Sequence, residues 1–195
     1  TRFYDPNDGS VTIDGYDIRN VTIDSLRTQL GVVPQEPFLF AGTIRDNVAF
    51  SKPDATDEDV WDALKSTGLA PLINSMDNGI NTIIHERGSS LSAGERQLVA
   101  IARAFLSQPR VLVLDEATSN LDLQSEKIVE EALDSLLDGR TAIIVAHRLA
   151  TVMRADRIAV VDGGEIIELG SHDDLIASKG KYAEMHTAWK AAVGQ

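Results

Sequence analysis

A short apolar stretch that runs into two acidic residues is the clearest chemical feature of this 195-residue sequence. In VLVLDEATSNLD, residues 111–122, four apolar residues lead into Asp115 and Glu116. A carboxylate at the end of a buried strand can hold a hydrated magnesium ion, and a second acid beside it can orient or deprotonate a water molecule. Ordinary strands also end in solvated acids, so the motif alone leaves both interpretations open.

A predicted amphipathic helix directly precedes this strand. In SSLSAGERQLVAIARAFLSQPR, residues 89–110, Ser92 and Glu95 have the spacing of a capping box, which is a structural interpretation. A helix N-terminus with a serine hydroxyl and the bare amide of Gly94 also attracts phosphate. The apolar stripe of the helix is formed by Leu98, Ile101, Ala102 and Phe105.

Three apolar runs without polar alternation predict the sheet that would position these residues. They are RVLVLDE, RTAIIVAHR and DRIAVVDGG, and such strands are usually covered on both faces, as in a parallel sheet. The spacer after the first run has a helical stripe of Val129, Ala132, Leu133 and Leu136. Strand, helix and strand in this order predict a right-handed α/β unit.

The flanking segments predict a small β-layer and a helical insertion. GSVTIDGYDI, residues 9–18, has a period of two and a glycine turn, which favours an antiparallel hairpin. Residues 56–107 are mostly helical in pattern, and TDEDVWDALKSTG begins with Thr56 as a cap and has an apolar face of Val60, Trp61 and Leu64. Near the C-terminus, Tyr182, Met185 and Trp189 form one helical stripe, which indicates core packing or a partner contact.

Composition excludes several classes of protein. The formal net charge of −12 and the pI near 4.6 argue against a nucleic-acid binder. The sequence has no cysteine, so it forms no disulfide and no thiolate metal site. No apolar run approaches the roughly 20 residues of a membrane helix, and no signal peptide opens the chain. A membrane role would therefore require a partner or a segment outside these residues.

Five motifs in order then resemble the nucleotide-binding domain of ATP-binding cassette (ABC) transporters. These are a glutamine loop in VVPQEPFLFAGTIRDNVAF, a signature in LSAGE, a Walker B strand in VLVLDE, a D-loop in SNLD and a switch histidine in AHR. The resemblance extends from the first residues to about residue 178, and PQEPFLFAGTIRDN with ERGSSLS is similar to the exporter type, whose cassette is usually fused behind a membrane domain. It implies an α/β, P-loop NTPase-like ABC ATPase core with a helical subdomain and a small antiparallel β-layer, its N-terminal part missing.

The resemblance implies ATP and Mg²⁺ as ligands and a role for each residue of the cis site. Gln35 would contact the magnesium or the attacking water and sense the membrane domain. Asp115 would hold Mg²⁺ through water, and Glu116 would be the catalytic base. His147, which follows an apolar strand, would reach the γ-phosphate.

The same resemblance implies a second, identical or different cassette as partner. Ser92 and Gly94 would grip the γ-phosphate of ATP held by that partner, and Asp122 would cross the same interface. The signature departs from the usual LSGGQ at Ala93 and Glu95. We expect the extra methyl to be tolerated and Glu95 to turn back to cap its helix, which predicts a working but slower signature.

A phosphate-binding loop is missing from the motif series. No G-x-x-x-x-G-K-[ST] occurs, and the only Gly-Lys pair, Gly180-Lys181, is followed by tyrosine. By resemblance, TRFYDPNDGSVTIDG follows shortly after this loop, so we expect the chain to begin downstream of the loop, of the adenine-stacking aromatic residue and of the first strands. Alone, it is predicted to bind MgATP poorly, to have no significant turnover and to be weakly folded.

The sequence divides into a predicted β-layer and start of the core (1–34), a glutamine loop with the helical subdomain (35–107), and a catalytic core with C-terminal helices (108–195). The leading hypothesis is part of an exporter ATPase subunit that couples ATP hydrolysis to transmembrane transport at the cytoplasmic face of the membrane, with a transmembrane domain as partner and no nucleic acid. A non-catalytic dimerisation or regulatory module is the alternative. Because Glu116, His147 and Gln35 would serve the chain's own site, their presence favours the first hypothesis. A DNA-repair or chromosome-structure ATPase is disfavoured by the glutamine-loop sequence, the acidic charge and the lack of a long coiled-coil insertion.

Overall fold

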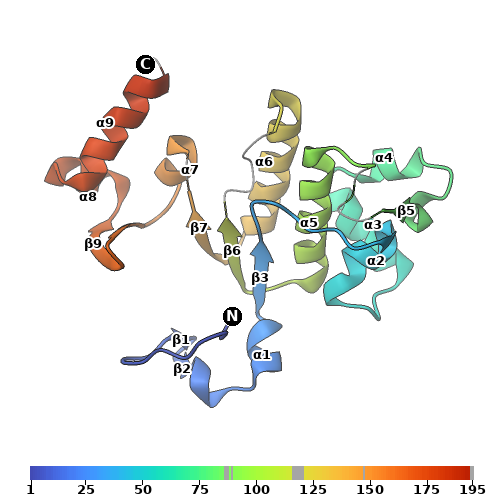
Figure 1. Ribbon diagram of the computed structural model, residues 1–195, viewed down its shortest axis with the longest axis horizontal. Coiled ribbons are helices and arrows are strands. Elements are labelled where there is room, and N and C mark those ends of the chain that lie inside the picture. Colours follow the sequence, from blue (N-terminus) through green and yellow to red (C-terminus); the bar gives the residue numbers. More distant parts are fainter. Residues whose placement is uncertain (86–87, 89, 116–120, 147, 194–195) are drawn as a thin grey trace. The chain divides into compact units, whose positions relative to one another are not determined.

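The computed structural model describes residues 1–85, 88, 90–115, 121–146 and 148–193 (Figure 1). Contacts divide the chain into two compact units, Thr1–Val145 and Ala146–Gln195. The first unit contains β1 (Thr12–Ile13), β2 (Tyr16–Asp17), α1 (Ile23–Arg27), β3 (Leu30–Val33), β4 (Gly42–Thr43), α2 (Ile44–Val48), α3 (Asp57–Ser66), α4 (Ala70–Asn74), β5 (Ile83–Ile84), α5 (Ala93–Ser107), β6 (Val111–Asp115), α6 (Leu123–Leu137) and β7 (Thr141–Val145). The second contains α7 (Leu149–Met153), β8 (Ile158–Asp162), β9 (Glu165–Gly170), α8 (His172–Ser178) and α9 (Lys181–Val193).

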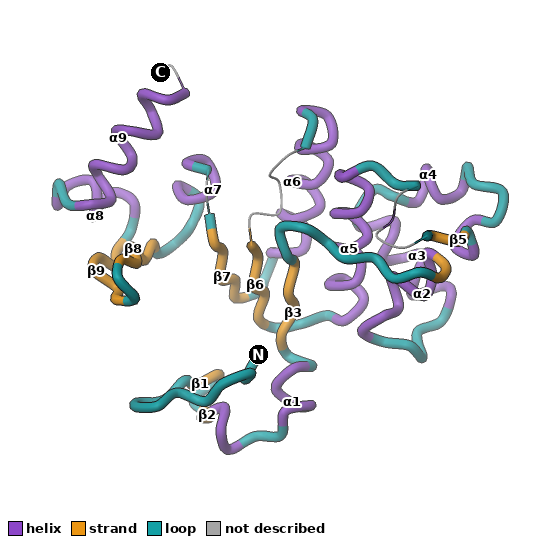
Figure 2. The backbone as a smooth tube through the Cα atoms, viewed as in Figure 1, coloured by secondary structure: helices purple, strands orange, loops and turns teal. Residues whose placement is uncertain are grey.

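A parallel sheet forms the centre of the first unit (Figure 2). Its strand order is β3-β6-β7, and β6 pairs in parallel with both neighbours. The chain leaves β6, passes through α6 and returns as β7, which is the predicted α/β unit. The sequence prediction of a parallel α/β core is therefore confirmed for the first two apolar runs.

One face of this sheet is covered and the other is open. The buried row includes Val33, Leu112 and Leu114, which share a core with the apolar stripes of α5 and α6. All four predicted members of the α6 stripe are buried. On the opposite face Val32 is 50% exposed and Ile143 59%. Among the described residues only one face of the sheet is packed, so the expected cover on the second face stays a prediction.

The segment predicted to be helical, residues 56–107, contains α3, α4 and α5, which share a core with the preceding α2. Thr56 caps α3 in a capping box with Asp59, and Val60 and Leu64 are fully buried, as the sequence pattern predicts. None of the helices within the described residues has the length and apolar character that a bilayer crossing requires.

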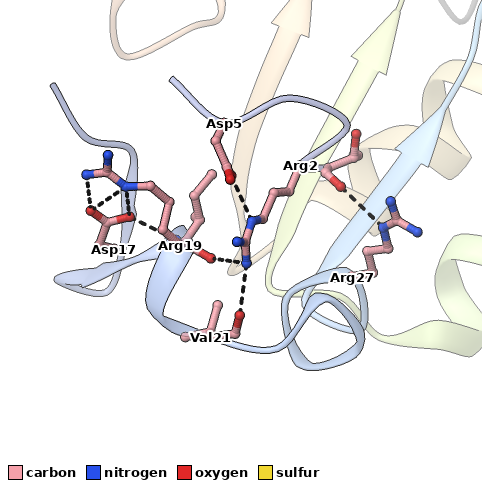
Figure 3. Close-up of polar contacts among 8 residues, drawn as sticks. Arg2, Asp5, Asp17, Arg19, Val21 and Arg27 are labelled. Atoms are coloured by element: carbon pink, nitrogen blue, oxygen red, sulfur yellow. Dashed lines mark hydrogen bonds and ion pairs between the residues drawn. The ribbon is translucent and has the colours of Figure 1, made fainter. Parts of the chain in front are cut away.

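The N-terminal segment is held to the rest of the first unit by arginines (Figure 3). Arg2 donates from Nη1 to the carbonyl oxygens of Ile18 and Val21, each at 3.0 Å, and from Nε to Asp5 at 2.8 Å. Strands β1 and β2 pair antiparallel across the Asp14-Gly15 turn, which confirms the predicted hairpin.

In the second unit, the third apolar run does not extend a parallel sheet. Strand β8 pairs antiparallel with β9 through a two-residue turn of Gly163 (φ 57°) and Gly164 (φ 85°). Two positive φ angles in succession suit a tight hairpin turn, which glycine adopts without steric cost. The Gly-Gly pair was the signal of a local hairpin, and the parallel assignment of this run is wrong among the described residues.

The buried stripe of α9 also differs from the prediction. Tyr182 is 1% exposed and Trp189 packs on the same small core, but Met185 is 38% exposed and His186 lies buried at 8%. Nε2 of His186 has no hydrogen-bond partner in the described part of the chain. The His172 ring lies 5.2 Å from the His186 ring and shares a 2.7 Å hydrogen bond through Nδ1 with the Tyr182 hydroxyl.

This cluster predicts acid sensitivity of the second unit. Burial, followed by the charge of Lys190 and by His172, lowers the pKa of His186 below the usual value near 6.5. As the pH falls below about 7, the unfolded chain binds this proton before the folded one, so stability decreases until the folded histidine also titrates. The measurement is Trp189 fluorescence in a Trp61→Phe background, which makes Trp189 the single tryptophan. On acidification, we expect the protein with His186 to unfold at a higher pH than the same protein carrying His186→Leu. The exposed His85→Gln serves as control, and equal acid sensitivity of His186→Leu and the parent would contradict this prediction.

Candidate functional site

The carboxyl edge of the parallel sheet brings together the first two candidate site residues. Asp115 ends β6, and the pairing of Val33 with Leu114 places Pro34 level with it and Gln35 one residue beyond. Both Asp115 and Gln35 are exposed. Because β3 and β6 are parallel neighbours, their two polar side chains follow the same edge, where α/β proteins bind ligands.

Two predicted catalytic residues continue from the same edge in sequence. Glu116 directly follows Asp115, and His147 comes two residues after Val145, which pairs with Asp115 across β6 and β7. Both Glu116 and His147 lie outside the described residues. Their roles stay predictions.

The donor chemistry of this edge fits magnesium. Carboxylate and amide oxygens are hard ligands, and Mg²⁺ usually keeps several waters while taking one or two carboxylates and substrate phosphates. Within the described residues, no three His, Cys, Asp or Glu side chains are grouped to hold a metal. The carboxylate of Asp115 and the side-chain amide oxygen of Gln35 are oxygen ligands of the kind that a hydrated Mg²⁺ ion takes.

The N-terminus of α5 forms the predicted capping box. Ser92 Oγ accepts from the Glu95 amide at 3.2 Å, and the Ser92 amide donates to the Glu95 carboxylate at 2.7 Å. Glu95 thus turns back onto its own helix, as expected from the spacing. Ser92 and Ala93 are exposed at the tip of a 15-residue helix, a position at which helix N-termini bind anions in other proteins.

A close approach of two helix tips brings the remaining candidates together. Gly94 is buried against α6, and a Cβ at this position would lie 2.7 Å from Ser125 Cβ and 2.9 Å from Ser125 Oγ. Asp122 caps α6 by accepting from the amides of Gln124 (3.1 Å) and Ser125 (3.0 Å) and from the Ser125 hydroxyl (2.6 Å). The bonds from Ser125 lower the pKa of Asp122, which keeps it ionised. Ser92, Gly94 and Asp122 therefore belong to two packed helix starts, joined by Ser125.

Gln97 is a site residue that sequence reasoning missed. It is 2% exposed on α5, and its Nε2 donates to the Pro34 carbonyl oxygen at 3.3 Å. This bond connects the signature helix to the residue before Gln35. The sequence did contain a signal for this bond. Gln97 adjoins the apolar stripe of the helix, and a buried side-chain amide needs a hydrogen-bond partner.

Three exposed phenylalanines downstream of Gln35 form a second missed feature. Phe38, Phe40 and Phe50 are 52%, 42% and 57% exposed. The Phe40 ring lies 5.0 Å from Phe38, edge to face, and 4.5 Å from Phe50, stacked. A grouped set of exposed aromatic rings marks an interaction surface more often than isolated apolar residues do. We call Phe38, Phe40 and Phe50 the aromatic patch.

Restoring glutamine at position 95 tests the charge at the α5 tip. Glu95→Gln keeps an acceptor for the Ser92 amide, so the capping box should survive. Removing one negative charge at about 6 Å from a phosphate in a watery environment is worth roughly 0.7 kcal/mol, about threefold in affinity. We expect the ATP concentration for half-maximal turnover of the intact protein to fall by about that factor, and the difference to shrink at high salt. A rise in that concentration would contradict the prediction.

Comparisons with known proteins match this arrangement to a family. The sequence profile described as ABC transporter matches residues 1–119. The chain is 48% identical over 187 residues to the uncharacterized ABC transporter ATP-binding protein YwjA of Bacillus subtilis (strain 168), covering 96% of this chain and 32% of that protein. It is 44% identical over 189 residues to the probable multidrug resistance ABC transporter ATP-binding/permease protein YheH of the same organism, covering 97% of this chain and 28% of that protein.

The fold agrees with the sequence comparison. The structure of a bacterial Atm1-family ABC exporter with ATP bound matches with a TM-score of 0.87 and 43% identity, over 96% of this chain and 33% of that one. The chain thus spans about a third of the length of the relatives it matches. On its motif order, its fold and these similarities, the chain belongs to the ABC transporter family.

Proposed function

We propose that this chain is part of the ATP-hydrolysing subunit of an ABC exporter and couples ATP hydrolysis to transmembrane transport. The observation that carries the proposal is the parallel register that sets Asp115 and Gln35 at one sheet edge, in the motif order of the family. The similarity to an exporter with ATP bound supports it. The similarity to YheH, whose name combines ATP-binding and permease parts, supports a membrane domain as partner.

In this proposal each residue of the cis site acts on ATP or on water. Bound Mg²⁺ would neutralise phosphate charge, with Asp115 holding it through water. Glu116 would take the proton of the attacking water, and Gln35 would orient that water. His147 would contact the γ-phosphate.

A second cassette would complete the site. The α5 tip with Ser92 and Gly94 would bind the γ-phosphate of the partner's ATP, and Asp122 would lie at the same interface. The support is their joint position on the packed starts of α5 and α6. The partner can be a second copy or a different cassette.

The phosphate loop would come from a segment outside these 195 residues. The sheet offers a place for it, because β7 pairs only with β6 in the described part of the chain and Val145 is 48% exposed. A further strand beside β7, followed by a helix over Val32 and Ile143, would cover this face and bring the loop to the edge that carries Asp115. The relatives, about three times as long, have room for such a segment.

The aromatic patch would be the docking surface for the membrane domain. Its three rings form an exposed apolar surface directly downstream of Gln35, the residue expected to sense that domain. An apolar helix end of a membrane domain is the complementary partner. In this proposal the cassette would lie at the cytoplasmic face of the membrane.

Separating the chain from its phosphate loop should remove activity. Without loop amides and lysine, Asp115 and Glu116 present negative charge to a polyanion, so we expect weak MgATP binding and no significant turnover from the 195 residues alone. The test compares MgATP binding and phosphate release by this chain and by the intact protein in lipid. Turnover by the chain alone that disappears in Glu116→Gln would overturn the prediction. An intact protein without turnover would favour the non-catalytic module.

A further inference from the structure

We propose that Arg103 is the positioning residue of the aromatic patch and joins it to the signature helix. Contact at the patch and the placement of Ser92 and Gly94 would then be set through one element, α5. The inference rests on the proposed function of the patch as a docking surface, and it adds a residue and a physical connection that the sequence motifs do not contain.

Three hydrogen bonds hold the segment that carries the patch to Arg103. The guanidinium donates from Nε to the Asn47 carbonyl oxygen at 2.6 Å and from Nη1 to the Phe38 carbonyl oxygen at 2.7 Å. Nη2 donates to Asn47 Oδ1 at 2.8 Å. The planar fork of arginine thus reaches two points nine residues apart in sequence, a geometry that lysine cannot reproduce.

Asn47 connects Arg103 to Phe40, the ring that contacts both other rings of the aromatic patch. It is 1% exposed, and its Nδ2 donates to the carbonyl oxygens of Phe40 (2.9 Å) and Thr43 (3.0 Å). The Phe40 amide returns a 2.9 Å bond to Asn47 Oδ1. Phe40 is therefore fixed through its own backbone to a side chain that Arg103 holds.

The guanidinium also contacts the rings directly. Its Cζ lies 5.9 Å from the Phe40 ring centroid and 5.7 Å from that of Phe50, within the range of cation–π attraction. Among the described residues, Arg103 forms no ion pair with a carboxylate. Burial lowers the pKa of Arg103 to about 10, so it remains charged at neutral pH. Its charge is directed at carbonyl oxygens and aromatic faces, which together set the position of Phe38, Phe40 and Phe50.

The backbone of α5 carries the connection to the signature. Ser92 caps this helix and Arg103 lies eleven residues later, about 16 Å along a continuous helix. Gln97 between them bonds to the Pro34 carbonyl oxygen. Two residues of α5 therefore hold the segment from Pro34 to Asn47 on either side of Gln35. Gln97 binds it before Gln35, at Pro34, and Arg103 binds it after Gln35. A displacement of the patch would move α5, and with it Ser92 and Gly94, as one body.

A double-mutant cycle in the intact protein in lipid tests this connection. The variants are Arg103→Gln, Phe50→Ala and the two combined, and the readouts are the ATP turnover number and the ATP concentration for half-maximal rate. We expect each single variant to lower turnover about tenfold with little change in half-maximal concentration, because closure over ATP is impaired rather than its first binding. The combined variant should be no slower than either single one, since both interrupt the same connection. Arg45→Gln, a change of equal charge in α2 at an arginine that binds Asp57 and the Ala55 carbonyl oxygen, should stay within twofold of the parent.

The outcomes distinguish the role of Arg103 from the proposed docking function of the aromatic patch. If Phe50→Ala has no effect, the patch is not the docking surface and the proposed function is wrong on that point. If Phe50→Ala slows turnover but its effect multiplies with that of Arg103→Gln, the function stands and the Arg103 connection is overturned. Should Arg103→Gln fail to accumulate in the membrane, Arg103→Lys replaces it in the same cycle, because it keeps the charge and the stem while losing the fork. Multiplicative effects there overturn the inference equally.

Discussion

Replacing Glu116 by glutamine in the intact protein should lower its ATP turnover number by about 10²–10⁴-fold, the usual contribution of a positioned general base. The reason is the location of the neighbouring acid: Asp115 is the last residue of β6 at the ligand-binding edge of the sheet, and Glu116 follows it directly. Glutamine has nearly the same size and accepts a hydrogen bond, but it cannot take the proton of the attacking water. Binding of MgATP should therefore persist while hydrolysis stops.

The measurement separates these two effects. Phosphate release gives the turnover number, and nucleotide retention without hydrolysis gives the affinity, which we expect to stay within about threefold of the parent because the loop phosphate contacts are unchanged. Glu130→Gln, the same change at an exposed position of α6, should leave both quantities unaltered. Normal turnover in Glu116→Gln would remove the proposed base and return the chain to the non-catalytic alternative.

Features set by residues close in sequence could be predicted correctly from that sequence. The capping box of Ser92 with Glu95 and the threonine cap at Thr56 were both expected, and the structure completes the second as a box with Asp59. A capping box depends on local backbone geometry alone, so the surrounding fold does not decide it. The parallel pairing of β6 with β7 was accessible for a related reason, because an intervening helix of fixed hand leaves few alternatives.

Contacts between distant segments could not be predicted in this way. Gln97 meets Pro34 across 63 positions, and Arg103 meets Phe38 across 65, so no spacing rule connects them. For β8 the error was of the opposite kind, because a local signal was missed. The apolar run was interpreted as a strand of the parallel sheet, but the Gly-Gly turn that follows it forms an antiparallel hairpin with β9. His186 was overlooked because histidine is a polar residue, and its contacts with the rings of Tyr182 and His172 follow from the folded structure rather than from the sequence pattern.

Gly94 illustrates most sharply what the sequence left undetermined. In the family resemblance it matters because its amide faces a phosphate, but the structure adds that its α-carbon lies against Ser125. A methyl group there would lie 2.7 Å from Ser125 Cβ, so Gly94→Ala must push the starts of α5 and α6 apart. Overpacking of this kind costs about 1–3 kcal/mol, against a gain of at most about 1 kcal/mol from the better helix former. We expect amide hydrogen exchange in the first turns of α6 to accelerate and ATP turnover of the intact protein to fall about 10- to 100-fold, because site residues lose their relative placement.

Two further variants decide whether this loss arises from packing or from phosphate contact. Ala93→Gly changes the exposed neighbour by the same single methyl and should leave turnover within about twofold, because the side chain at position 93 is exposed rather than packed. Combining Gly94→Ala with Ser125→Gly removes the colliding Cβ, so exchange protection in α6 should return even though Asp122 loses its bond to the Ser125 hydroxyl. If turnover returns with it, Gly94 acts through the helix contact. If protection returns and turnover does not, the methyl also obstructs the phosphate, and Gly94 has both roles. Unchanged exchange and turnover in the single Gly94→Ala variant would show that the two tips separate at no cost, contrary to the geometry.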